Sequence, residues 1–135
     1  MSKLVNKILE RDRALGNLCK EACQSYEQSN YFAAIACIFI LSEQVLKFSL
    51  DKNNGNFNQC IVEAKNKNII NNDEFLMLDS IRNMRNAIFH ENNYSQGLVL
   101  GGKLYPIDED ETKQIIFDTF SEPIFKMTLK IIENS

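Results

Sequence analysis

The sequence predicts an all-α protein, an up-and-down bundle of about five helices with a small β-hairpin before the last one. Apolar residues recur at helical spacing near both ends of the chain. The segment Tyr31–Leu41 is apolar on every side, which is typical of a helix at the centre of a bundle. A chain of 135 residues is long enough for one core, so residues 1–135 are expected to form a single domain.

The first two helices are predicted from periodicity and capping. One helix is expected from Lys3 to about Gln28, and a second is expected to follow a cap at Ser29 or Asn30 and to run to about Leu50. The apolar positions of the first helix are Leu4, Ile8, Leu15, Leu18, Ala22 and Tyr26.

A loop around Gly55 precedes a short helix, expected from Asn56 to about Lys67. Asn72 or Asp73 is expected to cap the next helix, which ends near the only histidine, His90. The inward residues of the short helix are expected to be Phe57, Cys60, Ile61 and Ala64. In the next helix Met77, Ile81, Met84 and Ile88 form the expected core stripe, whereas Phe75, Leu78 and Phe89 fall on the polar side.

The last third of the chain has a different character. Leu98 to Tyr105 is expected to form a hairpin that turns at two glycines. A final helix is expected to begin with a capping box of Asp108 and Glu111. Pro123 is expected to kink this helix, unless Ser121 restarts it as a second segment.

Composition narrows the function classes. The net charge of −3 and the pI of about 5.2 argue against broad non-specific nucleic-acid binding. The N-terminus lacks the apolar core of a signal peptide, and the longest apolar run is too short to span a bilayer. A cytoplasmic protein without a membrane partner is therefore expected. The four cysteines are expected to be reduced core thiols, because no zinc-binding spacing accompanies them.

The functional residues are predicted in the segment from Arg82 to Glu91. Arg85, the polar Asn86 and His90 form an Arg-Asn-x-x-x-His pattern. Arginine binds phosphate through paired N–H donors, and histidine can accept and donate a proton near neutral pH. On a helix Arg82, Asn86 and His90 share one row, whereas Arg85 lies roughly 140° from His90. The alternative is purely structural: Arg85 caps backbone carbonyls or pairs with an acid, and His90 lies at a helix C-terminus, where the dipole favours its cationic form.

This pattern resembles the signature of the HEPN family, as does the order of the expected helices around it. The resemblance implies an all-helical, metal-independent ribonuclease, often a toxin or defence effector, that needs no cofactor. It implies that Arg85, Asn86 and His90 are catalytic, with Arg82 as a weaker contact to the RNA substrate. An acidic or polar residue of the second helix often sits beside such a pair, which points to Glu43, although an exposed helical glutamate is an equal alternative.

The same resemblance implies a homodimer with its active site between two protomers. Each chain has one histidine, and acid–base cleavage of RNA usually needs two proton-transfer groups, which a two-fold dimer supplies. Phe89 is expected at that interface, and an antitoxin or defence-complex partner is implied. Some family toxins carry a modified tyrosine two residues after the histidine. Here that position is Asn92, with Tyr94 two residues further on.

A second hypothesis from another class stays open. The same residues would suit a non-catalytic nucleotide-binding or dimerisation module within a larger defence or regulatory complex. Such a module would bind a nucleotide phosphate without cutting RNA.

Overall fold

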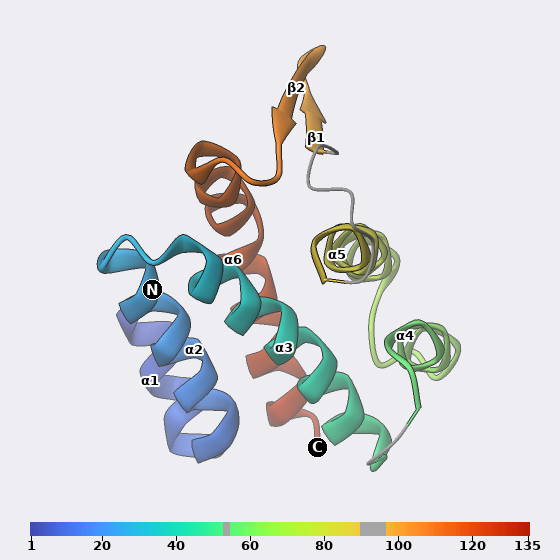
Figure 1. Cartoon of the computed structure of the whole chain (residues 1–135). Helices are drawn as coiled ribbons and strands as arrows, with labels where there is room; N and C mark the ends of the chain where they lie inside the picture. The colour runs from blue at the N-terminus through green and yellow to red at the C-terminus, as the bar shows by residue number, and fades with distance from the viewer. Residues whose placement is uncertain (53–54, 90–96) are drawn as a thin grey trace.

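The computed structural model describes residues 1–52, 55–89 and 97–135, and it confirms an all-α bundle with one hairpin (Figure 1). The elements within these ranges are α1 (Ser2–Arg11), α2 (Arg13–Glu27), α3 (Tyr31–Leu50), α4 (Phe57–Asn66), α5 (Asn72–Phe89), β1 (Gly97–Leu100), β2 (Lys103–Pro106) and α6 (Asp110–Glu133). Helix α3 lies between the α1–α2 pair and the α4–α5 pair, and α6 packs behind it.

The first expected helix is in fact two, which is why the described residues hold six helices instead of five. Asp12 separates them in an extended conformation. Its backbone N–H donates to the Ile8 carbonyl and closes α1, while its side chain accepts from the Leu15 N–H at 2.9 Å and caps α2. The chain can therefore turn and pack α1 against both α2 and α6.

Gly16 allows α1 and α2 to approach closely. A Cβ atom at this position would lie 2.6 Å from the Leu9 Cα, which is backbone and cannot rotate away. We expect Gly16→Ala to lower the free energy of unfolding by about 1–3 kcal/mol, because the helices must separate. Helix propensity alone would raise stability by roughly 1 kcal/mol. Urea denaturation measures whether Gly16→Ala lowers or raises the free energy of unfolding. Asn17→Ala, an exposed change on the same helix, is the control.

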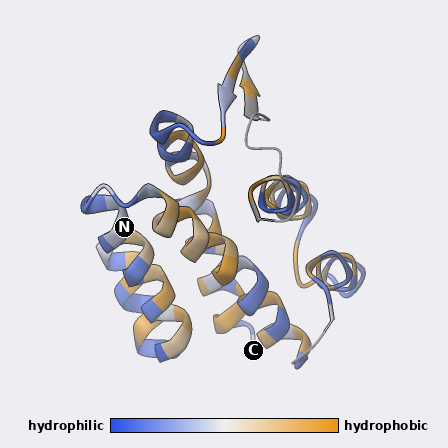
Figure 2. Ribbon diagram, in the orientation of Figure 1, coloured by the Kyte–Doolittle hydropathy of each residue, from blue (hydrophilic) through white to orange (hydrophobic). Residues whose placement is uncertain are grey.

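Helix α3 supplies the centre of the core, although one of its faces is open. Ile35, Ile38 and Phe39 are fully buried, whereas Phe32 and Ile40 are 49% and 47% exposed. The first half of the helix is largely apolar, and hydrophilic residues appear in its second half (Figure 2). The helix was expected to be buried on most sides, but the face that carries Phe32 and Ile40 is exposed.

Among the described helices, α3 also has the length and apolarity of a membrane-crossing segment. Of its most apolar 18 residues, 44% are buried inside the bundle. The interior helix of a bundle has the same length and composition as a membrane-crossing helix.

Helix α5 begins and packs differently from the sequence-based expectation. Asn71 and Glu74 form a reciprocal capping box, with both backbone–side-chain bonds at 2.8 Å, so the cap is neither Asn72 nor Asp73. Leu78, expected on the polar side, is fully buried and joins Ile81 in the core.

The hairpin follows the prediction. Leu98 pairs with Tyr105 and Val99 with Leu104, and Gly101 and Gly102 turn the chain with φ angles of 58° and 77°. Positive φ at both turn positions is the geometry that favours glycine there.

Helix α6 starts without the expected capping box. Glu109 occupies the N-cap position and makes no side-chain cap bond. The helix continues through Pro123, and the buried Ser121 does not start a second segment.

All four cysteines lie in described helices and are free thiols. Cys19 and Cys60 are buried in the core, as predicted, whereas Cys23 and Cys37 are only partly buried. Burial, with a smaller contribution from the neighbouring Cys23, raises the pKa of Cys19 to about 12. Cys19 is therefore a protonated, unreactive core thiol at neutral pH.

Candidate functional site

Arg85 occupies a position on α5 that points toward the bundle. It follows Ile81 by four residues and precedes Ile88 by three, and both isoleucines are buried. Only 26% of the Arg85 side chain is exposed. A guanidinium group in such a position needs a partner, because burying an isolated charge is costly.

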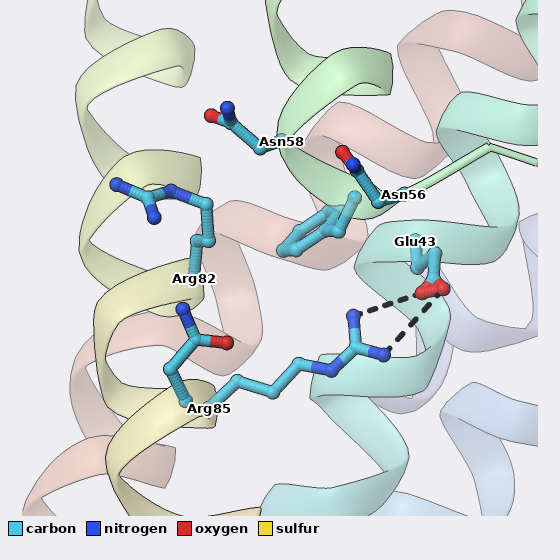
Figure 3. Close-up of a pocket in the computed structure, with 7 residues that line it drawn as sticks. Glu43, Asn56, Asn58, Arg82 and Arg85 are labelled. Atoms are coloured by element: carbon cyan, nitrogen blue, oxygen red, sulfur yellow. Dashed lines mark hydrogen bonds and ion pairs between the residues drawn. The ribbon is translucent and has the colours of Figure 1, made fainter. Parts of the chain in front are cut away.

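Glu43 of α3 is that partner. Arg85 Nη1 donates to Glu43 Oε2 at 2.8 Å, and Nη2 donates to Oε1 at 3.5 Å (Figure 3). Lys47, one turn further along α3, lies 3.5 Å from the same carboxylate. Glu43 is thus an inward-facing residue held between two cations, and the alternative of an exposed helical glutamate is wrong.

These contacts keep Glu43 ionised. Burial alone would raise its pKa, but the hydrogen bond and charge of Arg85, helped by Lys47, lower it below its usual value. The carboxylate therefore orients Arg85 and offsets part of its positive charge.

The start of α4 forms the opposite wall. The Phe57 ring lies under the Arg85 guanidinium, with 5.3 Å from Cζ to the ring centroid. Asn56 and Gln59 form a capping box, in which the Asn56 side chain accepts from the Gln59 N–H at 2.8 Å. The cap fixes the helix N-terminus beside the arginine, where the helix dipole favours negative charge.

A cleft of about 280 Å³ lies between these three helices (Figure 3). Its lining residues are Glu43 of α3, Asn56, Phe57 and Asn58 of α4, and Arg82, Arg85 and Asn86 of α5. Arg82 is also held in place, because Nε and Nη2 both donate to Asp79 Oδ1, at 3.2 and 3.0 Å. The ion pairs at this site contain three cations and two anions, namely Arg82, Arg85 and Lys47 with Glu43 and Asp79. The net charge of this group is therefore +1, although the protein as a whole is acidic.

Four of the five predicted site residues therefore line one cleft: Glu43, Arg82, Arg85 and Asn86. His90, Asn92, Tyr94 and the side chain of Phe89 lie outside the described residues. The sequence-based prediction missed the α4 wall, because it assigned Phe57 only to the core and Asn56 only to the start of the short helix. The available signal was Asn56-Phe57-Asn58, where two carboxamides flank a buried ring.

This arrangement is suited to a phosphate group. Two arginines and a helix N-terminus offer N–H donors and positive charge in a partly desolvated cleft. Within residues 1–52, 55–89 and 97–135, no three His, Cys, Asp or Glu side chains are grouped so that they could hold a metal ion.

The Glu43–Arg85 pair makes stability depend on pH. Because the pKa of Glu43 is lowered in the folded state, its contribution is fully present above the usual value near 4.5 and is lost as pH falls through the folded pKa. We expect Glu43→Gln to lower the free energy of unfolding by on the order of 1–2 kcal/mol at neutral pH. The difference from wild type should shrink as the pH falls below 4.5 and the carboxylate becomes protonated.

Thermal unfolding between pH 3 and pH 7, read by circular dichroism, measures this difference at each pH. Glu10→Gln, an exposed change on α1, is the matched control. A constant difference between wild type and Glu43→Gln across the range would show that the carboxylate charge is not what stabilises the pair.

No protein-family model, curated protein or solved structure matches this chain significantly. The resemblance to the HEPN family therefore rests on the Arg-Asn-x-x-x-His pattern and on the order of the helices around it.

Proposed function

We propose that the protein is a metal-independent endoribonuclease of the HEPN type, acting as a toxin or antiviral-defence effector. The observation that carries the proposal is that one cleft is lined by Arg82, Arg85 and Asn86. Glu43 also lines this cleft and holds Arg85 in place by a hydrogen bond. A ribonuclease of this class needs a fixed cation at the scissile phosphate, and this cleft offers two.

In the proposed reaction, Arg85 binds the scissile phosphate and neutralises charge that develops on its oxygens. A base removes the proton of the 2′-hydroxyl, whose oxygen then forms a bond to phosphorus as the bond to the 5′-oxygen breaks. An acid returns a proton to that leaving oxygen. The products are a 2′,3′-cyclic phosphate and a 5′-hydroxyl, and no metal or water takes part.

We assign the proton transfers to His90 and propose that the protein acts as a homodimer. One histidine per chain then supplies both the base and the acid across a two-fold axis. Asn86 orients one of the two imidazoles, and Arg82 contacts a second phosphate of the RNA. We also propose that the protein is cytoplasmic and that it binds an antitoxin or a partner in a defence complex.

The test is incubation of the purified full-length chain with total RNA, with and without EDTA. Cleavage that persists in EDTA and leaves 2′,3′-cyclic phosphate ends is the expected result. Cleavage that requires Mg²⁺ would contradict the mechanism, as would intact RNA at high protein concentration.

A non-catalytic nucleotide-binding or dimerisation module is the second candidate. It is favoured by the Glu43 contact, because two of the Arg85 donor groups are already engaged. Such a module would bind nucleotides in the cleft and leave RNA intact at every protein concentration. Nucleotide binding and RNA integrity, measured on the same preparation, separate the two candidates.

A further inference from the structure

Helices α1, α2 and α6 form two adjoining cavities that are separate from the cleft of α3, α4 and α5. The first, of about 340 Å³, lies between α2 and α6, and the second, of about 330 Å³, lies between α1 and α2. Both are lined by Met1, Cys23 and Glu27, so one opens beside the other. The α1–α2 pair lies on the other side of α3 from α4 and α5 (Figure 1).

Ser121 lines the cavity between α2 and α6 with a hydroxyl group that lacks a partner. The residue is only 4% exposed, and its side chain makes no hydrogen bond to any residue within 1–52, 55–89 and 97–135. Ser42 and Thr128, which are also buried in helices, each donate to the carbonyl four residues earlier. Because a buried hydroxyl is normally hydrogen-bonded, the free one indicates a polar group of a ligand.

The charges around this hydroxyl match a ligand with one positive charge. Three carboxylates line the same cavity, those of Glu27, Asp118 and Glu122. Two cations lie close to them: the Lys126 ammonium, 3.2 Å from Glu122, and the amino group of Met1, which also lines the cavity. Three anions and two cations leave one negative charge, which one ammonium group of a ligand neutralises.

The position of Asp118 is fixed before any ligand binds. The Tyr26 hydroxyl donates to Asp118 Oδ1 at 2.8 Å, and the Tyr26 ring stacks on Phe117 with 4.2 Å between the ring centroids. Burial and this hydrogen bond raise the pKa of Tyr26 to about 12, so the hydroxyl remains a donor at neutral pH. The carboxylate is therefore held in place without losing its charge.

The second cavity extends the site along α2. Glu27 lies at one end and Lys20 at the other, about 10 Å apart at 1.5 Å per residue. Val5, Leu9 and Cys23 line the stretch between them, which suits an aliphatic chain. The Lys20 ammonium repels a second cation at the far end, so the charge pattern disfavours a polyamine.

We propose that these cavities bind a lysine side chain presented by a partner protein, with its ammonium group beside Ser121, Asp118 and Glu27. An apolar neighbour of that lysine packs against Val5 and Leu9. This inference goes beyond the proposed function, because it assigns a binding site on a different set of helices.

The experiment titrates the full chain with the peptide acetyl-Leu-Lys-Leu-amide and follows the backbone amide signals by NMR. The signals of α2 and α6 around the cavity are expected to shift. Acetylation of the lysine removes its charge and keeps its stem, so it should weaken binding about tenfold or more. Hexylamine and spermidine, which carry ammonium groups without a peptide, should bind more weakly than the peptide.

Variants of α6 separate a binding role from a structural one. Ser121→Ala should weaken peptide binding about tenfold and leave the free energy of unfolding unchanged or higher, because the hydroxyl has no protein partner to lose. Asp118→Asn keeps an acceptor for Tyr26 and removes the charge, so it should weaken binding to a similar degree. Asp73→Asn makes the same change at an exposed position of α5 and is the matched control.

The proposal is overturned if the peptide causes no shifts at its highest soluble concentration, or if the acetylated peptide binds as tightly. Equal or tighter binding of hexylamine or spermidine would assign the site to a free amine instead of a partner protein. Loss of stability in Ser121→Ala without loss of binding would make the hydroxyl structural. None of these measurements involves RNA, so their outcome is independent of the proposed ribonuclease activity.

Discussion

Arg85→Ala is expected to abolish RNA cleavage, lowering the rate by about a hundredfold to a thousandfold or more, as removal of a fixed donor at developing charge does. The half-buried guanidinium lies in the cleft, where it is hydrogen-bonded to Glu43 and lies over the Phe57 ring. Arg85→Lys keeps the positive charge and loses the planar pair of donors, so it should restore little of the rate. Single-turnover cleavage of a labelled RNA measures each rate.

The fold of the variant has to be checked, because Arg85→Ala removes the main partner of Glu43. Lys47 remains 3.5 Å from that carboxylate, so the charge is not left alone. The helical circular-dichroism signal should persist. Arg13→Ala, an exposed arginine at the start of α2, makes the same change in net charge and should cleave RNA at the wild-type rate.

His90→Ala is expected to lose cleavage to a similar degree, since acid–base catalysis contributes about 10²–10⁴-fold. If Arg85→Ala or His90→Ala cleaves RNA as wild type does, that residue has no catalytic role. The Arg85–Glu43 pair would then be a structural link between α3 and α5.

The second large effect is expected in the core. Ile38 is fully buried in α3, the helix that packs against both α2 and α6. Ile38→Ala removes three carbon atoms and leaves a cavity, so it should lower the free energy of unfolding by about 2–5 kcal/mol.

Urea denaturation of two variants of the same helix tests this. Ile40 lies two residues from Ile38 and is 47% exposed, so Ile40→Ala should cost well under half as much. Equal effects of the two substitutions would contradict the orientation of α3 in the bundle.

Much of the fold could be predicted from local sequence patterns. The bounds of α3 and the hairpin turn followed from residues close together in the chain, namely a continuous apolar run and the Gly101-Gly102 pair. Helix periodicity and turn chemistry are local properties, so one sequence is sufficient to predict them. The same holds for the inward face of α4, where Phe57 and Ile61 are buried as predicted.

Two features of the fold depend on tertiary packing: the division of the first helix and the inward face of α5. Asp12 divides the first expected helix into α1 and α2, and Gly16 lets these two helices approach closely. The contact between Gly16 and Leu9 exists only once both helices are packed together, so helical periodicity could not predict it. Leu78 fell on the polar side of a helical projection, and yet it is buried. The inward face of α5 consists of Leu78, Ile81, Arg85 and Ile88. Periodicity gives the angle between residues on a helix and does not say which angle faces a neighbour.

In the cleft, too, some features follow from the sequence and others only from the tertiary structure. The sequence by itself determined that Arg82, Arg85 and Asn86 belong to one helix and that Glu43 interrupts an apolar one. Only the tertiary structure decided that Glu43 pairs with Arg85, 42 residues along the chain, and that Asn56 and Asn58 close the opposite wall. The physical reason is that an inward-facing guanidinium must be neutralised where it is buried. Its partner is therefore set by the packing of α3, α4 and α5.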